Sequence, residues 1–229
     1  MQFQITHDVS SFVCAMSAHN MNALIPTLLR SYNIGDNQGP DCSIVEAARA
    51  TTACAGLFKP IFILQDGVKV PCVDSGLGRN NPTAPMLVEA ERLFPGARVA
   101  CIISIGTGHP ETISMPIHTD VFQRFLSPDM VQTLRSIASD CEATAHEMAH
   151  RFRHVDGVYF RFNVDQGMQS IGLSDWEKLS EVVVHTRQYA QTVEVTTRLN
   201  GAIGAIKSGK ATVPVEQLSE CASKPVEVY

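Results

Sequence analysis

The residue of this chain best placed for chemistry is Asp74, which ends the apolar run 68–73 and opens a loop containing two glycines. Reactive side chains of α/β proteins are often held where a strand ends, because the strand fixes the side chain and the loop leaves room for a ligand. A carboxylate in that position can act as a general base on a hydroxyl group or on water. Asp74 is therefore the first candidate for a catalytic residue.

A serine nucleophile beside such a base usually lies in the pattern G-x-S-x-G, whose glycines permit a strained turn. The sequence contains no such pattern, and Ser75 comes nearest, with Val73 where the first glycine is required. The seven cysteines are irregularly spaced without a C-x-x-C pair, so we expect reduced, buried thiols. No nucleophile is predicted in this chain.

Residues His146-Glu147-Met148-Ala149-His150 match the H-E-x-x-H signature of zinc proteases. In that mechanism both histidines bind the metal in a cleft and the glutamate activates a zinc-bound water. On a helical projection centred on the apolar Ala145, however, the histidines lie about 100° and 140° away. The pattern therefore predicts a solvent-exposed helix face with no metal site, and a zinc protease is kept as an alternative.

Alternating apolar strands and helices are expected to position these residues. We expect strands at 12–16, 58–64, 68–73 and 99–105, and helices from Ser43 to about Cys54 and from Thr83 to Phe94. Ser43 and Glu46 form a capping box, and Asp66-Gly67 predicts a tight turn between two strands. The run 99–105 is apolar throughout, as in a strand buried on both faces of a parallel sheet. It ends in Gly106-Thr107-Gly108, which could cradle an anion or form a simple turn.

The second half of the chain has a helical pattern. A long helix is expected from Ser127 to Phe152, then a half-exposed strand at 159–164. A second capping box, Ser174 with Glu177, predicts a helix to about Ile206. The last twenty residues contain two prolines and are expected to be loosely ordered. The alternation of elements along the chain predicts an α/β layered fold.

The composition fits a folded globular protein, with 229 residues, 45% hydrophobic residues and 18% charged residues. The net charge is −5 without long runs of either sign, which argues against a nucleic-acid partner. The first eight residues show no secretory signal, and no apolar run approaches the roughly 18 residues that span a membrane. We therefore expect a cytoplasmic protein, and no cofactor is predicted.

Five blocks in order along the chain resemble the patatin-like phospholipase family: 46–53, 58–61, 74–82, the pairs Glu89-Ala90 and Phe94-Pro95, and 104–108. The resemblance is strongest over residues 41–108. Residues 159–164 and Asp175-Trp176 are similar to an extension found in fungal members. The chain thus resembles the C-terminal part of a patatin-like domain of the fungal type.

The resemblance implies a lipid acyl hydrolase with a Ser–Asp dyad, in which Asp74 is the base that deprotonates the serine. It also implies a supporting loop, formed by Ser75, Gly76, Gly78, Asn80, Asn81, Gly106 and Gly108. The substrate would be a lipid ester of the parent domain, with possible contact to a membrane surface. Ser75 stands where the family has glycine, and the segment 53–56 lacks the family's proline.

The family's oxyanion loop and G-x-S-x-G motif precede the aspartate by well over a hundred residues, whereas only 73 residues precede Asp74 here. We therefore expect a mostly parallel central sheet without its first strands and no hydrolase activity of the chain alone. Residues 1–118 would form the partial core, and 119–229 a helical extension packed on the same domain. An incomplete sheet should expose an apolar edge, which predicts self-association. A non-catalytic interaction or lipid-binding module is the alternative.

Overall fold

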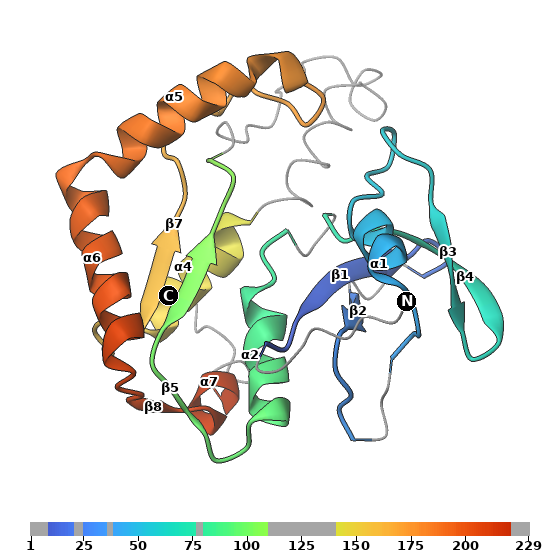
Figure 1. The fold of residues 1–229 in the computed structure, drawn as a ribbon, viewed down its shortest axis with the longest axis horizontal. Helices are drawn as coiled ribbons and strands as arrows, with labels where there is room; N and C mark the ends of the chain where they lie inside the picture. Colours follow the sequence, from blue (N-terminus) through green and yellow to red (C-terminus); the bar gives the residue numbers. More distant parts are fainter. Residues whose placement is uncertain (1–8, 21–24, 36–38, 77–79, 110–140, 221–229) are drawn as a thin grey trace, which may run out of the picture. The chain divides into compact units, whose positions relative to one another are not determined.

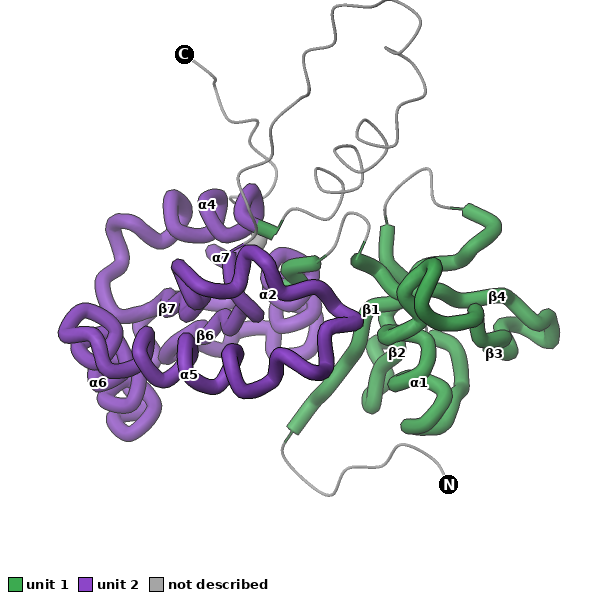
Figure 2. Tube along the Cα trace, turned by 90° about the horizontal axis from the view of Figure 1, so that it is seen from above, with its two compact units in different colours: residues 1–82, 115–141 green, residues 83–114, 142–229 purple. Residues whose placement is uncertain are grey.

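The computed structural model describes residues 9–20, 25–35, 39–76, 80–109 and 141–220. The chain divides into two compact units, residues 1–82 with 115–141 and residues 83–114 with 142–229, called here unit 1 and unit 2 (Figure 2). The division expected between residues 118 and 119 falls outside the described residues and stays a prediction. No helix among the described residues is long and apolar enough to cross a membrane.

Unit 1 consists of an antiparallel sheet of four strands and a helix packed on one of its faces (Figure 1). Its elements are β1 (Phe12–Ser17), β2 (Thr27–Arg30), α1 (Ile44–Thr51), β3 (Ile61–Gln65) and β4 (Val68–Asp74). The strand order is β2-β1-β4-β3, and every neighbouring pair is antiparallel. The chain is therefore α/β in content.

The expected mostly parallel central sheet is not found in the described residues, because short connections dictate the pairing in unit 1. Asp66 and Gly67 have φ values of 49° and 80°, as a tight hairpin turn requires, and they join β3 directly to β4. A connection of this length can only reverse the chain, since parallel strands need a long crossover. The turn itself was predicted correctly from the sequence.

Helix α1 begins with the predicted capping box. The Ser43 hydroxyl accepts a hydrogen bond from the Glu46 N–H, and the Glu46 carboxylate accepts one from the Ser43 N–H at 2.8 Å. These bonds satisfy N–H groups that the first helical turn leaves without partners. Ala47 and Ala50 then pack on the sheet against Ala15, Ile63 and Cys72. Because the two alanine side chains are small, the helix can lie close to the sheet.

Unit 2 combines helices with two short strand pairs. Its elements are α2 (Thr83–Leu93), β5 (Arg98–Val99), β6 (Ile102–Ile105), α4 (Glu142–Arg151), β7 (Tyr159–Phe162), the 3-10 helix η1 (Trp176–Lys178), α5 (Leu179–Ala190), α6 (Val193–Ser208), β8 (Val213–Pro214) and α7 (Glu216–Glu220). Strands β6 and β7 are parallel, whereas β5 and β8 are antiparallel.

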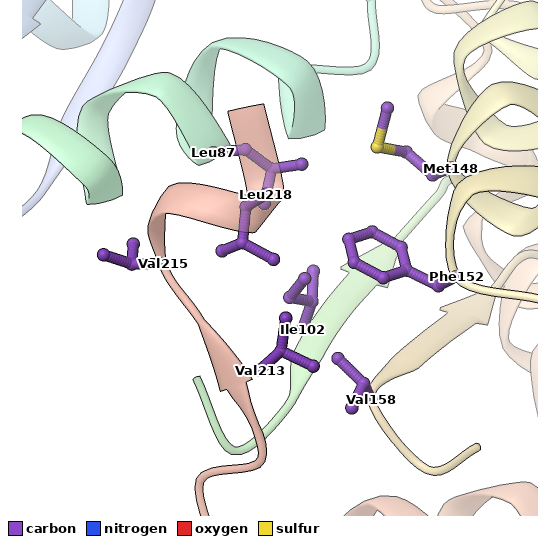
Figure 3. Packing of buried hydrophobic residues seen from close by; sticks show 8 residues of the cluster. All are labelled: Leu87, Ile102, Met148, Phe152, Val158, Val213, Val215 and Leu218. Carbon is purple, nitrogen blue, oxygen red and sulfur yellow. The ribbon is translucent and has the colours of Figure 1, made fainter. Parts of the chain in front are cut away.

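Residues far apart in the sequence build the core of unit 2 (Figure 3). The buried members are Leu87, Ile102, Met148, Phe152, Val158, Val213, Val215 and Leu218. Burying each such side chain contributes about 1.5–3 kcal/mol. Three of them come from β8 and α7 or the residue between, so the prediction that the last twenty residues are loosely ordered is wrong for residues 213–218.

Two other predictions fail in unit 2. The run 99–105 is not one strand buried on both faces: it is split between β5 and β6, and Ile103 and Ile105 are 40% and 77% exposed. The helix expected from Ser174 to about Ile206 is two helices, because the Thr192 hydroxyl accepts a hydrogen bond from the Val195 N–H and starts α6 anew. No side-chain cap bond marks the start of η1.

Candidate functional site

Asp74 is the last residue of β4, one residue beyond the strand end that the sequence predicted. It lies opposite Ala15 of β1, and its backbone N–H donates to the Ala53 carbonyl at 3.2 Å. The backbone is thus fixed from two sides, by a neighbouring strand and by the segment after α1. The side chain is half-buried, and its carboxylate makes no hydrogen bond or ion pair to another described residue.

The loop after Asp74 brings two of the predicted loop residues, Gly76 and Asn80, close to the Asp74 carboxylate. A Cβ atom added to Gly76 would lie 3.5 Å from both Asp74 Oδ2 and Asn80 Oδ1, so these three residues lie together. Asn81 is buried, and its amide Nδ2 donates to the Cys141 carbonyl at 3.4 Å. Ser75 is also buried, and Gly78 lies outside the described residues. The site in unit 1 is a carboxylate beside a small residue and an amide.

Gly106 and Gly108 belong to unit 2, where they form the turn after β6. The Gly106 N–H donates to the Phe162 carbonyl at 2.8 Å, and the Gly108 N–H donates to Asn163 Oδ1 at 2.7 Å. A Cβ atom on Gly106 would collide with Asn163 Oδ1 and lie 2.6 Å from Arg161 Nη2. Gly108 has φ +126°, which side chains rarely adopt. Glycine is therefore required at both positions.

Asn163 connects this turn to a buried polar network. Its Nδ2 donates to Glu142 Oε1 at 3.0 Å, and its backbone N–H donates to the Tyr189 hydroxyl at 3.1 Å. The same Glu142 carboxylate lies 3.7 Å from Arg161 Nη2. One asparagine thus holds the turn to α4 and to α5 at once.

The network extends along β6 and to the surface. Arg161 Nη1 donates to Ser104 Oγ at 3.0 Å, and Ser104 shares a 3.2 Å hydrogen bond with the Thr83 hydroxyl. His109 lies between two acids, with Nδ1 3.6 Å from Glu142 Oε2 and Nε2 3.7 Å from Asp165 Oδ1. The group is a set of polar contacts around the glycine turn, in which Ser104, Thr83 and Asn163 are buried and Asp165 is exposed.

Sequence reasoning did not find Arg161 and Asn163 as members of this group. A signal was present, because alternation over the strand expected at 159–164 would place residues 159, 161 and 163 on one face. The sequence did not say which residues they meet, since Glu142 and the glycine turn come from distant parts of the chain.

Burial favours the neutral forms of one hydroxyl in unit 2 and two thiols in unit 1. Burial raises the pKa of the Tyr159 hydroxyl, while nearby Ser104 and Arg161 oppose the shift. Burial likewise raises the pKa of the Cys42 and Cys72 thiols. A thiol whose pKa is raised forms little thiolate, so neither cysteine is suited to be a nucleophile. No cysteine among the described residues forms a disulfide, and of them only Cys14 and Cys72 are buried.

The H-E-x-x-H segment lies on α4 with its polar residues outward. His146 and His150 are exposed, and Met148 between them is fully buried in the unit 2 core. Glu147 forms a 2.6 Å ion pair with Arg151, which also donates to the Leu218 carbonyl. Among the described residues, no group of three or more His, Cys, Asp or Glu side chains could hold a metal ion. This geometry differs from that of a zinc protease.

Comparison with known proteins gives partial similarities to lipid hydrolases. Over 118 residues, or 52% of this chain, it is 32% identical to calcium-independent phospholipase A2-gamma of Oryctolagus cuniculus and equally to that of Homo sapiens. It is also 27% identical over 209 residues to probable inactive patatin-like protein 9 of Arabidopsis thaliana. These matches support a relation to patatin-like phospholipases.

The matches cover unequal parts of the relatives. The chain spans 14% of the length of the two phospholipases and 53% of the plant protein, while 84% of the chain itself is matched by the latter. No protein-family model and no solved structure matches the chain.

Proposed function

We propose that this chain is the C-terminal part of a patatin-like lipid acyl hydrolase domain of the fungal type, with Asp74 as the base of a Ser–Asp dyad. The observation that carries the proposal is the position of Asp74 at the end of β4, half-buried beside Gly76 and Asn80. The similarity to a calcium-independent phospholipase supports it. Asp74 would take the proton of the serine that attacks the lipid ester, and then help water to cleave the acyl-enzyme.

The chain alone is proposed to be inactive. Its sequence has no G-x-S-x-G pattern, so no serine is presented to Asp74 on the turn that this chemistry uses. An oxyanion without preorganised backbone donors loses roughly 3 kcal/mol of stabilisation or more. The similarity to a plant protein named as probably inactive supports this part of the proposal. The parent enzyme would act in the cytoplasm, on lipid esters at a membrane surface.

A chimera tests the role of Asp74 directly. Residues 41–108 of this chain would replace the segment of the human phospholipase that aligns with them, and the rest of that enzyme would be kept. We expect the chimera to hydrolyse a nitrophenyl ester and to lose at least about a hundredfold in kcat when Asp74→Asn is introduced, the range expected for removal of a general base. Asp66→Asn, in the exposed β3–β4 turn, is the matched control and should leave kcat unchanged.

The isolated chain provides the complementary measurement. It should show no turnover of the same ester above the rate of the Asp74→Asn variant. Turnover that depends on Asp74 in the isolated chain would reveal a nucleophile within it and contradict the proposed inactivity. An active chimera whose kcat is unchanged by Asp74→Asn would contradict the role of Asp74 as the base of the dyad.

A lipid-surface-binding module is the second candidate, and one observation favours it. Leu173, Trp176 and Leu179 are 85%, 73% and 62% exposed, and α5 buries none of its residues. Exposed leucines beside a tryptophan are typical of segments that enter a membrane interface. Trp176 is the single tryptophan of the chain, so its fluorescence reports binding directly. A blue shift on adding phosphatidylcholine vesicles would support this function, and an unchanged spectrum would exclude it for this surface.

A further inference from the structure

The outer edge of unit 1 is a short strand with an unusual amount of exposed apolar surface. Strand β3 stands at the end of the order β2-β1-β4-β3, so only one of its edges is hydrogen-bonded to a described strand (Figure 1). Phe62 and Leu64 are 59% and 55% exposed. Ile63 between them is buried against α1, and because side chains of a strand alternate, Phe62 and Leu64 share the opposite face.

Edge strands usually carry features that prevent another strand from pairing with them, such as charges, prolines or bulges. Strand β3 has none of these over its five residues, and all five pair in regular register with β4. Strand β2 at the other edge differs: it has four residues, ends in Arg30, and none of them is an exposed large hydrophobic residue. The two edges of this sheet are therefore unequal, and within the described residues β3 is the edge available to a further strand.

The charges that flank β3 identify the strand it would accept. Lys59 precedes the strand and Asp66 follows it, both exposed, while residues 61–65 carry no charge. If β3 pairs with a second β3 in antiparallel orientation, the Lys59 end of each copy comes beside the Asp66 end of the other. A parallel arrangement would instead place like charges together. The charge pattern is thus complementary to itself in one orientation only.

We propose that β3 is a dimerisation edge that pairs antiparallel with β3 of a second copy of this chain. Centring the pair on Ile63 places Phe62 of one copy opposite Leu64 of the other, twice, across a two-fold axis. The two sheets of unit 1 then join into one sheet of eight strands, and the exposed Phe62 and Leu64 side chains contact each other across the new pair. This inference rests on unit 1 alone and is independent of lipid ester hydrolysis.

Two variants that introduce charges of opposite sign on β3 test the pairing. In the double variant Phe62→Lys/Leu64→Lys each lysine faces a lysine of the other copy, and in Phe62→Glu/Leu64→Glu each glutamate faces a glutamate. Like charges directly opposite disfavour pairing, so we expect the dissociation constant measured by analytical ultracentrifugation to rise by about tenfold or more in each variant. An equimolar mixture of the two variants should recover the dimer. Both residues are exposed, and circular dichroism would verify that each variant is folded.

A matched control and a second measurement make the outcome decisive. Leu173→Lys, at an exposed leucine of unit 2, should leave dimerisation unchanged. In the unmodified chain, amide hydrogen exchange over residues 61–65 should slow as the protein concentration rises. A full chain that stays monomeric at all concentrations would overturn the proposal, as would a dimer that both charge variants retain or that Leu173→Lys abolishes.

Discussion

The loop after β4 and the turn after β6 both begin where a strand ends, but the surrounding chain holds them differently. The turn after β6 is fixed by Gly106, Gly108 and His109 N–H groups that donate to Phe162, Asn163 and Val164 respectively. Buried polar side chains surround it. By contrast, the described contacts at Asp74 are made by its backbone, and its carboxylate has no partner among the described residues.

The difference distinguishes a loop whose hydrogen-bonding groups maintain its own conformation from a loop that keeps a side chain available to a ligand. A turn whose donors and acceptors are consumed by internal bonds has a conformation that depends on those bonds, and few groups remain for a ligand. A carboxylate without a partner among the described residues contributes little to the contacts described for the fold and keeps its acceptor capacity for another molecule. The mutations that destabilise the protein most should therefore lie around Gly106, and those that alter chemistry around Asp74.

The largest effect is expected from Asn163→Leu. The leucine removes the acceptor for the Gly108 N–H and the donor to Glu142, both in a buried site, and should lower the free energy of unfolding by about 2–4 kcal/mol. Urea denaturation measures the change. The same substitution at the exposed Asn80 is the control, with an expected cost below about 1 kcal/mol. Equal losses at both positions would show that the two loops do not differ.

A pair of glycine substitutions sharpens the comparison. Gly106→Ala forces Asn163 and Arg161 to move and should cost about 1–3 kcal/mol in unfolding free energy, as overpacking does. At Gly76 the added Cβ would meet its nearest atoms at 3.5–3.6 Å, which is ordinary contact, so Gly76→Ala should change stability by less than about 0.5 kcal/mol. Thermal unfolding of both variants gives the difference, and a more costly Gly76→Ala would reverse the comparison.

A smaller effect is expected at the start of α1, which packs on the strands β1 and β4 that hold Asp74. Ser43→Ala removes the cap and should cost about 1 kcal/mol. The backbone N–H of Ser43, and then its hydroxyl, lower the pKa of Glu46. A lowered folded-state pKa stabilises the protein above the unfolded-state pKa, and this contribution is lost as pH falls through the folded value. Glu46→Gln should therefore be destabilising at about pH 7, and its cost should shrink as the pH falls below the ordinary pKa of a glutamate, as urea denaturation at several pH values would measure.

The comparison also shows where sequence reasoning succeeded. The place of Asp74 at the end of a strand was predicted because its signal is local: an apolar run, an acid and glycines within ten residues. The capping box at Ser43 and the turn at Asp66-Gly67 were found for the same reason, since a helix start and a tight turn are determined by neighbouring residues.

Features set by distant residues were missed. The Gly108–Asn163 bond joins residues 55 positions apart, and no periodicity in either segment indicates the other. The antiparallel order of unit 1 was missed because apolar runs identify strands without identifying their partners. Val213 and Val215 looked like parts of a loose tail, since their burial depends on Leu87 and Ile102 from elsewhere in the chain.

The smallest effect on stability is expected where the largest effect on chemistry is proposed. Asp74→Asn keeps the shape of the side chain, the position opposite Ala15 and the backbone bond to Ala53, and it removes a charge that has no described partner. The free energy of unfolding should change by less than about 0.5 kcal/mol, measured by urea denaturation. A loss above about 2 kcal/mol would mean that the carboxylate is held by the fold as firmly as Asn163 is, and would remove the reason to treat Asp74 as free for a substrate. Because the variant should fold like the unmodified chain, any loss of turnover in the chimera can be assigned to the carboxylate itself.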